Sequence, residues 1–112
     1  MSDEIRKWEK HTSRVVSDHR IFKIREDHTT NPRTGSEHEM VVLECPDWVN
    51  IIALTPEREV VFVEQYRQGS ETVELEIPGG MMDPGETDPV ATALRELREE
   101  TGYTGEKARV IG

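Results

Sequence analysis

Apolar residues occur along the chain in short runs, and residues that favour turns separate these runs. In the N-terminal part, β-branched and aromatic residues mixed with charges indicate two strands, at residues 14–16 and 20–25. Turn formers are dense at residues 29–38, and another extended apolar run follows at residues 40–44. The pattern therefore predicts a small antiparallel β-sheet whose last two strands are joined by a long loop.

A second group of extended runs follows a break at Pro46. Residues 49–54 and 60–65 predict the two strands of a hairpin, because the segment between them is rich in turn formers. Residues 72–77 alternate strictly between apolar and polar side chains, which is the pattern of a strand with one buried face. The face expected to be buried carries Val73, Leu75 and Ile77.

A helix is predicted next, from about Pro89 to Thr101. Asp88 is a favourable N-cap, Pro89 suits the first helical position, and Gly102 suits the residue after the last turn. Apolar residues recur at spacings of three and four, which gives the helix one stripe that can pack on a sheet. The stripe consists of Val90, Ala93, Leu94, Leu97 and Thr101. Strands followed by one delimited helix indicate the α+β class.

The chain is acidic, with 23 Asp and Glu residues against 14 Lys and Arg residues and a net charge of −9. Such a charge repels nucleic-acid phosphates and anionic lipids, so we expect neither nucleic acid nor membrane as a partner. The single cysteine, Cys45, cannot form an internal disulfide, and no secretory signal or membrane-spanning run is present. These features together predict a cytoplasmic protein.

Three carboxylates on the predicted helix carry the first sign of chemistry. Glu96, Glu99 and Glu100 fall on one edge of the helix, because positions three and four apart are neighbours. Arg95 can reach Glu99 one turn on, but like charges at this spacing destabilise a helix unless something offsets them. A divalent cation would do so, and Mg²⁺ prefers such oxygen ligands. Taken alone, however, an Arg- and Glu-rich helix is most often a solvated face.

A glycine-rich segment lies between the last predicted strand and this helix. Gly79, Gly80 and Gly85 follow the strand directly, and a backbone without side chains can approach a ligand closely. A glycine loop by itself is a weak signal, because it is usually only a turn. A strand, a glycine loop and an acid-bearing helix in succession are a stronger one.

The whole segment, residues 80–103, resembles the Nudix box of the Nudix hydrolase family. That pattern is a glycine, five residues, a glutamate, seven residues, then Arg-Glu, an apolar residue, any residue, Glu-Glu, any residue, a glycine and an apolar residue. The matching positions are Gly80, Glu86, Arg95, Glu96, Leu97, Glu99, Glu100, Gly102 and Tyr103. One feature departs from the pattern, because eight residues separate Glu86 from Arg95. We expect the extra residue near Thr87, outside the helix.

The resemblance implies a fold and a domain organisation. The family has an α/β/α sandwich with a mixed sheet, so residues 47–112 would be the N-terminal part of a Nudix domain. Residues 1–46 would form the preceding small antiparallel β-sheet, with an expected role in dimerisation. On this view the chain is truncated after the Nudix helix, and the catalytic general base lies beyond Gly112.

Upstream of the box, the chain is similar to the ADP-ribose pyrophosphatase branch, which has Gln-Tyr-Arg after one strand and Glu-x-Pro-Gly-Gly after the next. The resemblance implies a site for Mg²⁺, with Mn²⁺ as an alternative ion. Its expected ligands are the Gly79 carbonyl, Glu96 and Glu100, supported by Glu99. The expected catalytic set is Glu99, Glu100, Glu96 and Arg95. The expected substrate contacts are Arg67, Glu76, Met81 and Glu86.

The implied activity is metal-assisted hydrolysis of a pyrophosphate bond in a nucleoside diphosphate derivative. ADP-ribose, cleaved to AMP and ribose 5-phosphate, is the favoured substrate, and a nucleotide sugar of the GDP-hexose type is the nearest rival. Bound cations and Arg67 would attract the diphosphate in spite of the overall acidity. The alternative is a catalytically silent Nudix-fold module that only binds a nucleotide. The full-length protein is expected to be a homodimer.

Other chemically distinctive residues are interpreted as structural. Trp48, beside a strand, is expected in the core, and Cys45 is expected to be a buried strand thiol. Trp8 either anchors a strand or is a stacking residue donated across a dimer. The four histidines are interpreted as scattered surface residues, because none has a partner at metal-ligand spacing.

Overall fold

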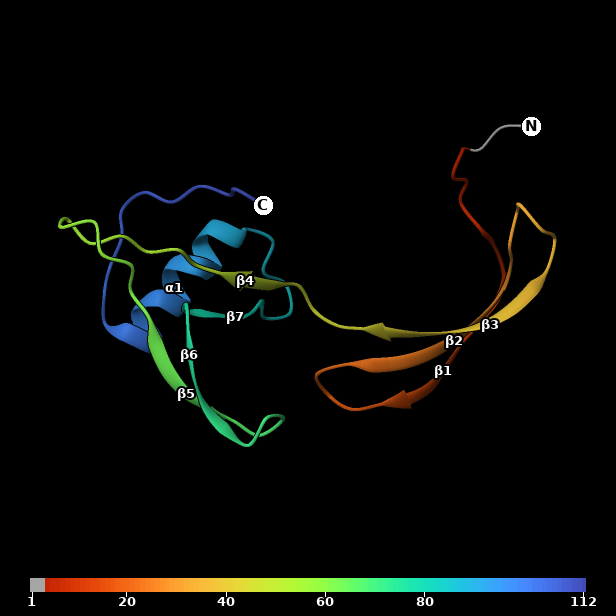
Figure 1. Ribbon diagram of the computed structural model, residues 1–112, viewed down its shortest axis with the longest axis horizontal. Helices are drawn as coiled ribbons and strands as arrows, with labels where there is room; N and C mark the ends of the chain where they lie inside the picture. The colour runs from red at the N-terminus through yellow and green to blue at the C-terminus, as the bar shows by residue number, and fades with distance from the viewer. Residues whose placement is uncertain (1–3) are drawn as a thin grey trace. The chain divides into compact units, whose positions relative to one another are not determined.

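The structure is a computed structural model that describes residues 4–112. It divides into two compact units, one that ends at Cys45 and one that spans Pro46–Gly112 (Figure 1). The first unit contains β1 (Glu9–Asp18), β2 (Lys23–Thr30) and β3 (Glu37–Glu44). The second contains β4 (Trp48–Asn50), β5 (Val63–Arg67), β6 (Thr72–Glu76), β7 (Gly79–Met81) and the helix α1 (Pro89–Thr101).

The first unit is an antiparallel sheet in the order β1-β2-β3, as the sequence predicts. Its strands differ from the expected ranges. The loop between β2 and β3 covers only residues 31–36, because the polar residues on either side of it pair across the two strands. β2 starts at Lys23 and not at residue 20, because Arg20 adopts a left-handed conformation with φ of 66°.

A buried carboxylate organises this sheet. Asp27, in β2, accepts a hydrogen bond from the Ser13 hydroxyl at 2.5 Å, and Nε of Arg25 lies 3.1 Å from both of its oxygens. The bond from Ser13 is the main cause that lowers the pKa of Asp27, and Arg25 acts in the same direction. Arg25 also donates to Glu44 at 2.5 Å, so its guanidinium joins β2 to β3. The buried charge is therefore paired and hydrogen-bonded, as its desolvation requires.

The second unit is built from antiparallel pairs. β4 pairs with β7, β5 pairs with β6, and α1 packs against β4 and β7. Residues 49–54, expected to be one strand, are extended only in β4, and Leu54 forms an isolated bridge with Val60 across the predicted turn. Among residues 4–112 every strand pair is antiparallel and α1 is the one helix, so these residues do not form the mixed sheet and second helical layer of the expected sandwich.

The core of this unit lies between α1 and the β4–β7 pair. Its buried apolar side chains are Val49, Ile51, Met82 and Leu97. The helix has the predicted bounds: the Asp88 carboxylate accepts a hydrogen bond from the N–H of Val90, and Gly102 ends the helix in the left-handed conformation. Of the predicted stripe only Leu97 is fully buried, and Thr92, which the stripe does not include, is 0% exposed. The helix is therefore rotated so that one polar residue faces the interior.

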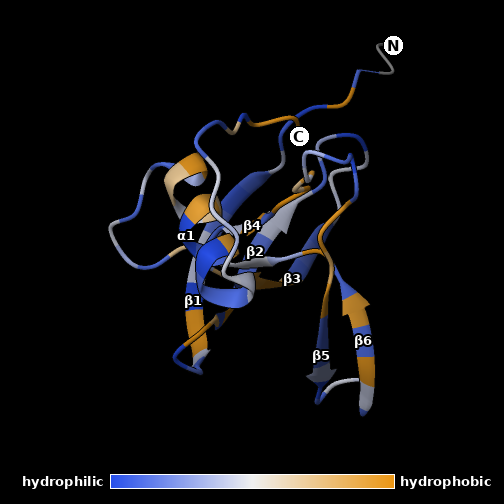
Figure 2. Ribbon diagram, turned by 90° about the vertical axis from the view of Figure 1, so that its left-hand side faces the viewer, coloured by the Kyte–Doolittle hydropathy of each residue, from blue (hydrophilic) through white to orange (hydrophobic). Residues whose placement is uncertain are grey.

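Three expectations about burial are wrong. Val73 and Leu75 are 67% and 66% exposed, because β6 pairs only with β5 and no described element covers that face of the hairpin. Figure 2 shows the alternation of apolar and polar residues along β6 that led to the expectation. Trp48 is 60% exposed, and Cys45 is also exposed, because β3 ends at Glu44 and the chain then leaves the first sheet.

No helix among residues 4–112 is long and apolar enough to cross a membrane.

Candidate functional site

The candidate site is formed where β7 lies against α1. The N–H of Gly79 donates to Oε2 of Glu100 at 3.3 Å, so a strand backbone meets a helix carboxylate directly. At Gly80, a Cβ atom would lie 2.4 Å from the carboxyl carbon of Glu96. The two consecutive glycines therefore let the strand backbone pass close to two of the three predicted carboxylates.

The position of β7 is itself fixed by backbone contacts. Gly79 pairs with Asn50 of β4, and a Cβ at position 79 would lie 2.5 Å from the Val49 carbonyl oxygen. The N–H of Met82 continues the connection by donating to the Asp47 carbonyl at 2.8 Å. The glycine segment is thus a short strand held between β4 and α1, where the sequence predicts only a loop.

Arg95 connects the three glutamates with the preceding loop. Its Nη1 lies 3.2 Å from Oε1 of Glu96 and 3.1 Å from Oε2 of Glu99, and its Nη2 lies 2.8 Å from Oε1 of Glu86. The predicted pairing with Glu99 is confirmed, while the contacts with Glu86 and Glu96 were not foreseen. Because this guanidinium is three-quarters buried, its charge offsets part of the repulsion between the carboxylates.

The carboxylate of Glu86 accepts hydrogen bonds from three groups. They are the Thr92 hydroxyl at 2.6 Å, the N–H of Asp83 at 2.7 Å and Nη2 of Arg95 at 2.8 Å. These bonds lower the pKa of Glu86 from 4.5 to about 2, the one from Thr92 having the largest effect. The helix begins at Pro89, three residues after Glu86, and Arg95 on the helix contacts Glu86 across this segment.

Glu96 has the opposite electrostatic environment. Partial burial raises its pKa, and the neighbouring charges of Glu99 and Glu100 act in the same direction, while Arg95 opposes them. A raised carboxyl pKa means that the folded chain disfavours the ionised form at this position. A cation bound there would reverse this preference, so the donor chemistry fits a hard divalent ion.

Arg67 and Glu76 form a second group of predicted site residues. The guanidinium of Arg67 donates twice to the carboxylate of Glu76, with distances of 2.7 Å and 2.6 Å, across the β5–β6 hairpin. The bonds from Arg67 lower the pKa of Glu76. The bonds to Glu76 are the main cause that raises the pKa of Arg67, and the charge of Glu100 acts in the same direction. The two residues are therefore bound to each other in this structure, and both were predicted to contact substrate.

The described residues do not contain a complete metal cage. Within residues 4–112 no three Asp, Glu, His or Cys side chains are grouped so that they could hold a metal ion. Mg²⁺ usually takes only one or two carboxylates from a protein, and water and phosphate oxygens complete its shell. Glu96 and Glu100 meet that smaller requirement. Glu99 is more exposed and bonds to Arg95, and Met81 is half-buried at the end of β7.

Thr92 is the residue of this site that the sequence analysis missed. It is fully buried on α1, and its hydroxyl contacts the glutamate ahead of the helix. A signal existed in the sequence, because threonine has a poor helix propensity and in a helix interior its hydroxyl needs a partner.

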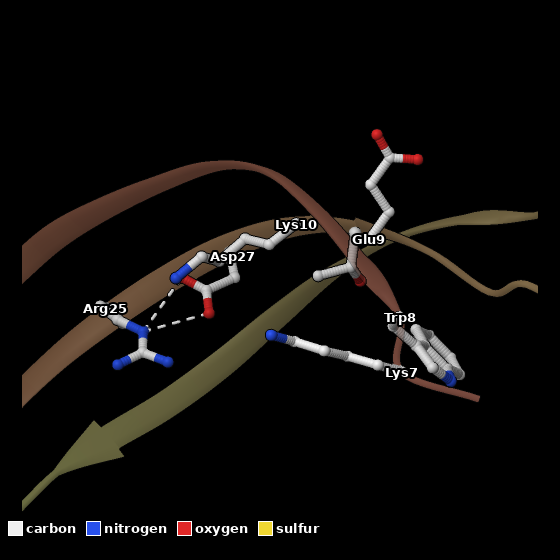
Figure 3. A pocket seen from close by; sticks show the side chains of 7 residues that line it. Lys7, Trp8, Glu9, Lys10, Arg25 and Asp27 are labelled. Atoms are coloured by element: carbon white, nitrogen blue, oxygen red, sulfur yellow. Dashed lines mark hydrogen bonds and ion pairs between the residues drawn. The ribbon is translucent and has the colours of Figure 1, made fainter. Parts of the chain in front are cut away.

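A separate hollow lies on the N-terminal sheet. Figure 3 shows it lined by charged side chains and by Trp8, which leans on the ring of His38 with the centroids 5.6 Å apart. Besides Trp8, its lining consists of Lys7, Glu9, Lys10, Arg25, Asp27 and Thr29. None of the residues predicted for metal or substrate lines it. In the described structure the ring of Trp8 lies beside that of His38, a residue of β3.

Residues 46–112 match the model of the family described as NUDIX domain. The chain belongs to the NUDIX family. This segment contains α1, β7 and the Arg67–Glu76 pair, so the geometry described above lies entirely inside the matched region. The resemblance seen in the sequence is thereby confirmed.

Individual NUDIX relatives agree with this assignment. The chain is 43% identical to the "Methanol dehydrogenase activator" of Bacillus methanolicus over 79% of its own length and 46% of that protein. It is 41% identical to the "ADP-ribose pyrophosphatase" of Bacillus subtilis (strain 168) over 69% of its own length and 41% of that protein. The chain thus spans less than half the length of both relatives.

A solved structure shows the fold. The crystal structure of an "ADP compounds hydrolase" matches with a TM-score of 0.77 and 24% sequence identity. The match covers 95% of this chain and 57% of the other chain. The arrangement of antiparallel strands and one C-terminal helix is therefore that of a NUDIX fold.

Proposed function

We propose that this chain carries the metal site of a NUDIX pyrophosphatase that hydrolyses ADP-ribose to AMP and ribose 5-phosphate. One observation carries the proposal: the carboxylate of Glu96 lies against the backbone of Gly80, and that of Glu100 accepts a hydrogen bond from the N–H of Gly79. Two carboxylates one helical turn apart, on a helix and beside a glycine backbone, offer oxygen ligands to a cation whose shell phosphate and water oxygens can complete. The three-layer sandwich of the family is expected for the complete domain.

Mg²⁺ bound at this site would neutralise the diphosphate and lower the pKa of the attacking water. We assign the ligand role to Glu96, Glu100 and the Gly79 carbonyl, and a supporting role to Glu99. Arg95 keeps Glu96 and Glu99 in place through two bonds from Nη1. The general base is not assigned to any residue of this chain.

We assign substrate binding to four further residues. Arg67 and Glu76 restrain each other through two bonds, which favours a defined orientation of the diphosphate and its sugar. Met81 and Glu86 flank the glycine segment and are proposed as further contacts. The bonds that hold Glu86 on the helix side suggest that it acts mainly by positioning its neighbours.

ADP-ribose is favoured over a GDP-hexose because the relatives named ADP-ribose pyrophosphatase include proteins of Bacillus subtilis, Saccharomyces cerevisiae and Mycobacterium tuberculosis. A catalytically silent module would be expected to lack acidic residues of the box. This chain retains Glu96, Glu99 and Glu100, and Glu96 and Glu100 lie against the backbone of β7. We therefore propose an enzyme.

The test is a turnover assay of the full-length protein with Mg²⁺ on ADP-ribose and on a GDP-hexose, with phosphate-containing products measured by chromatography. We expect AMP from ADP-ribose and no AMP from the Glu100→Gln variant. Preferred cleavage of the GDP-hexose would show that the nucleotide sugar, and not ADP-ribose, is the substrate. Absence of turnover on both substrates, together with tight ADP-ribose binding by calorimetry, would show that the protein is a silent binding module and not an enzyme.

A further inference from the structure

Thr92 occupies an unusual place on α1. It is 0% exposed, and it is the one fully buried polar residue of the helix. Its hydroxyl donates to Oε2 of Glu86 at 2.6 Å, and a buried hydroxyl without such a partner would be costly. The hydroxyl is therefore committed to the carboxylate of Glu86.

The bond from Thr92 completes the restraint of Glu86. Oε1 of that carboxylate is held by Asp83 and Arg95, while Oε2 is held by Thr92. With both oxygens fixed, the carboxylate cannot rotate about its terminal torsion, so it presents one defined oxygen to Arg95. Without the hydroxyl, Oε2 would face the buried interior with no donor from the helix.

Glu86 lies in a segment without regular secondary structure. Residues 86–88 lie outside regular structure between a turn at residues 84–85 and the start of α1, so nothing in the backbone ladder fixes Glu86 relative to the helix. The side-chain bonds to Thr92 and Arg95 are the links that join it to α1. Thr92 lies one turn before Glu96, on the part of the helix that faces the loop.

We propose that Thr92 is a positioning residue of the metal site, whose hydroxyl fixes the carboxylate of Glu86 and thereby the guanidinium of Arg95. Arg95 in turn holds Glu96 and Glu99 in the arrangement that the metal requires. The expected effect of Thr92 on metal binding rests on the proposed function. The restraint of Glu86 and Arg95 is a property of the chain without metal. Partners that orient metal ligands typically contribute a factor of about 10 to 100 in affinity or activity.

The restraint is tested first without metal. The order parameter of the Arg95 Nε–H group is measured by ¹⁵N NMR relaxation, and its signal is assigned by its loss in Arg95→Lys. We expect a rigid group in the wild type, a value below about 0.6 in Thr92→Val, and a rigid group again in Thr92→Ser. Thr101→Val is the matched control, because that hydroxyl bonds only within its own end of α1, to the Leu97 carbonyl and the Tyr103 N–H. An ordered Arg95 in folded Thr92→Val would overturn the proposal.

Should Thr92→Val not fold, Thr92→Ala removes the same hydroxyl, and Glu86→Gln breaks the connection from its other end. Both are expected to release Arg95, and retained order in a folded Glu86→Gln chain would equally overturn the proposal. The backbone NMR spectrum and the thermal unfolding midpoint establish that each variant is folded.

The consequence is tested by Mn²⁺ binding, measured by electron paramagnetic resonance. Thr92→Val should weaken binding by about 10-fold, and Thr92→Ser by less than about threefold. The effect of Thr92→Val should disappear when Glu86 is already Gln, because residues that act through one network are not additive. Equal Mn²⁺ affinities of wild type and Thr92→Val would overturn the positioning role. A wild type that binds no Mn²⁺ would instead refute the proposed function, while the NMR measurement still decides whether Thr92 restrains Arg95.

Discussion

Replacing Gly80 by alanine should displace one metal ligand while leaving the fold almost intact. The added carbon would lie 2.4 Å from the carboxyl carbon of Glu96 and 2.6 Å and 2.7 Å from its two oxygens. Non-bonded carbon atoms prefer about 3.5 to 4.0 Å, so the carboxylate must move by at least about 1 Å. Since it is the far end of a flexible side chain, it can do so at a cost of about 0.5 to 1.5 kcal/mol.

Mg²⁺ and Mn²⁺ sites do not tolerate a shift of that size. Octahedral Mg²⁺ coordination requires oxygen ligands at about 2.0 to 2.1 Å, so a carboxylate displaced by about 1 Å no longer binds. We expect Gly80→Ala to lower the affinity for Mn²⁺ by at least about 10-fold. The assay is Mn²⁺ titration by electron paramagnetic resonance, together with thermal unfolding to follow stability.

The neighbouring glycine provides the contrast. At Gly79 the added carbon would meet the Val49 carbonyl oxygen at 2.5 Å, and a backbone atom cannot move without opening the β4–β7 pair. Gly79→Ala should therefore destabilise the fold by about 1 to 3 kcal/mol. Gly69→Ala, which meets no atom within 4 Å, is the control for both variants. A folded Gly80→Ala chain that binds Mn²⁺ as tightly as the Gly69→Ala control would refute the metal assignment of Glu96.

Three further predictions address single groups. Glu100→Gln should reduce Mn²⁺ affinity at least about 10-fold with an unchanged circular dichroism spectrum, and unchanged affinity would remove Glu100 from the ligand set. Because the pKa of Glu86 is lowered to about 2, its contribution to stability is complete above about pH 4.5 and is lost as the pH falls towards 2. Acid unfolding of Glu86→Gln should therefore lack part of the stability loss in this window, and an unchanged acid profile would contradict the shift. Asp88→Ala should cost about 0.5 to 2 kcal/mol in thermal or urea unfolding, Asp88→Asn should restore most of it, and equal stability of all three chains would contradict the cap.

The helix and its ends could be predicted from the sequence because each depends on local chemistry. Asp88 caps the first turn, Pro89 starts the helix and Gly102 takes the left-handed conformation after it, all within a few residues of one another. The helical period also determines that Glu96 and Glu100 share an edge. Contacts at such short separations are decided by spacing alone.

Features that depend on distant partners could not be predicted. Thr92 faces the interior because a loop residue six positions earlier lies there, and the hydrophobic stripe gave no sign of it. His11 and His28 stand with ring centroids 5.7 Å apart, although 17 positions separate them, because the register of β1 and β2 brings them together. The alternation in β6 identified a strand but not what covers it, since burial is a property of the neighbours and not of the strand.

The charges of the site bear on the role that a metal has in the proposed mechanism. The sequence suggested that Arg67 would attract the diphosphate, but the structure shows it bound twice to Glu76. Arg95 is likewise engaged, by Glu86, Glu96 and Glu99. Both guanidinium groups are thus already paired with carboxylates. In the proposed mechanism divalent cations would bind first and would supply the positive charge that a diphosphate needs.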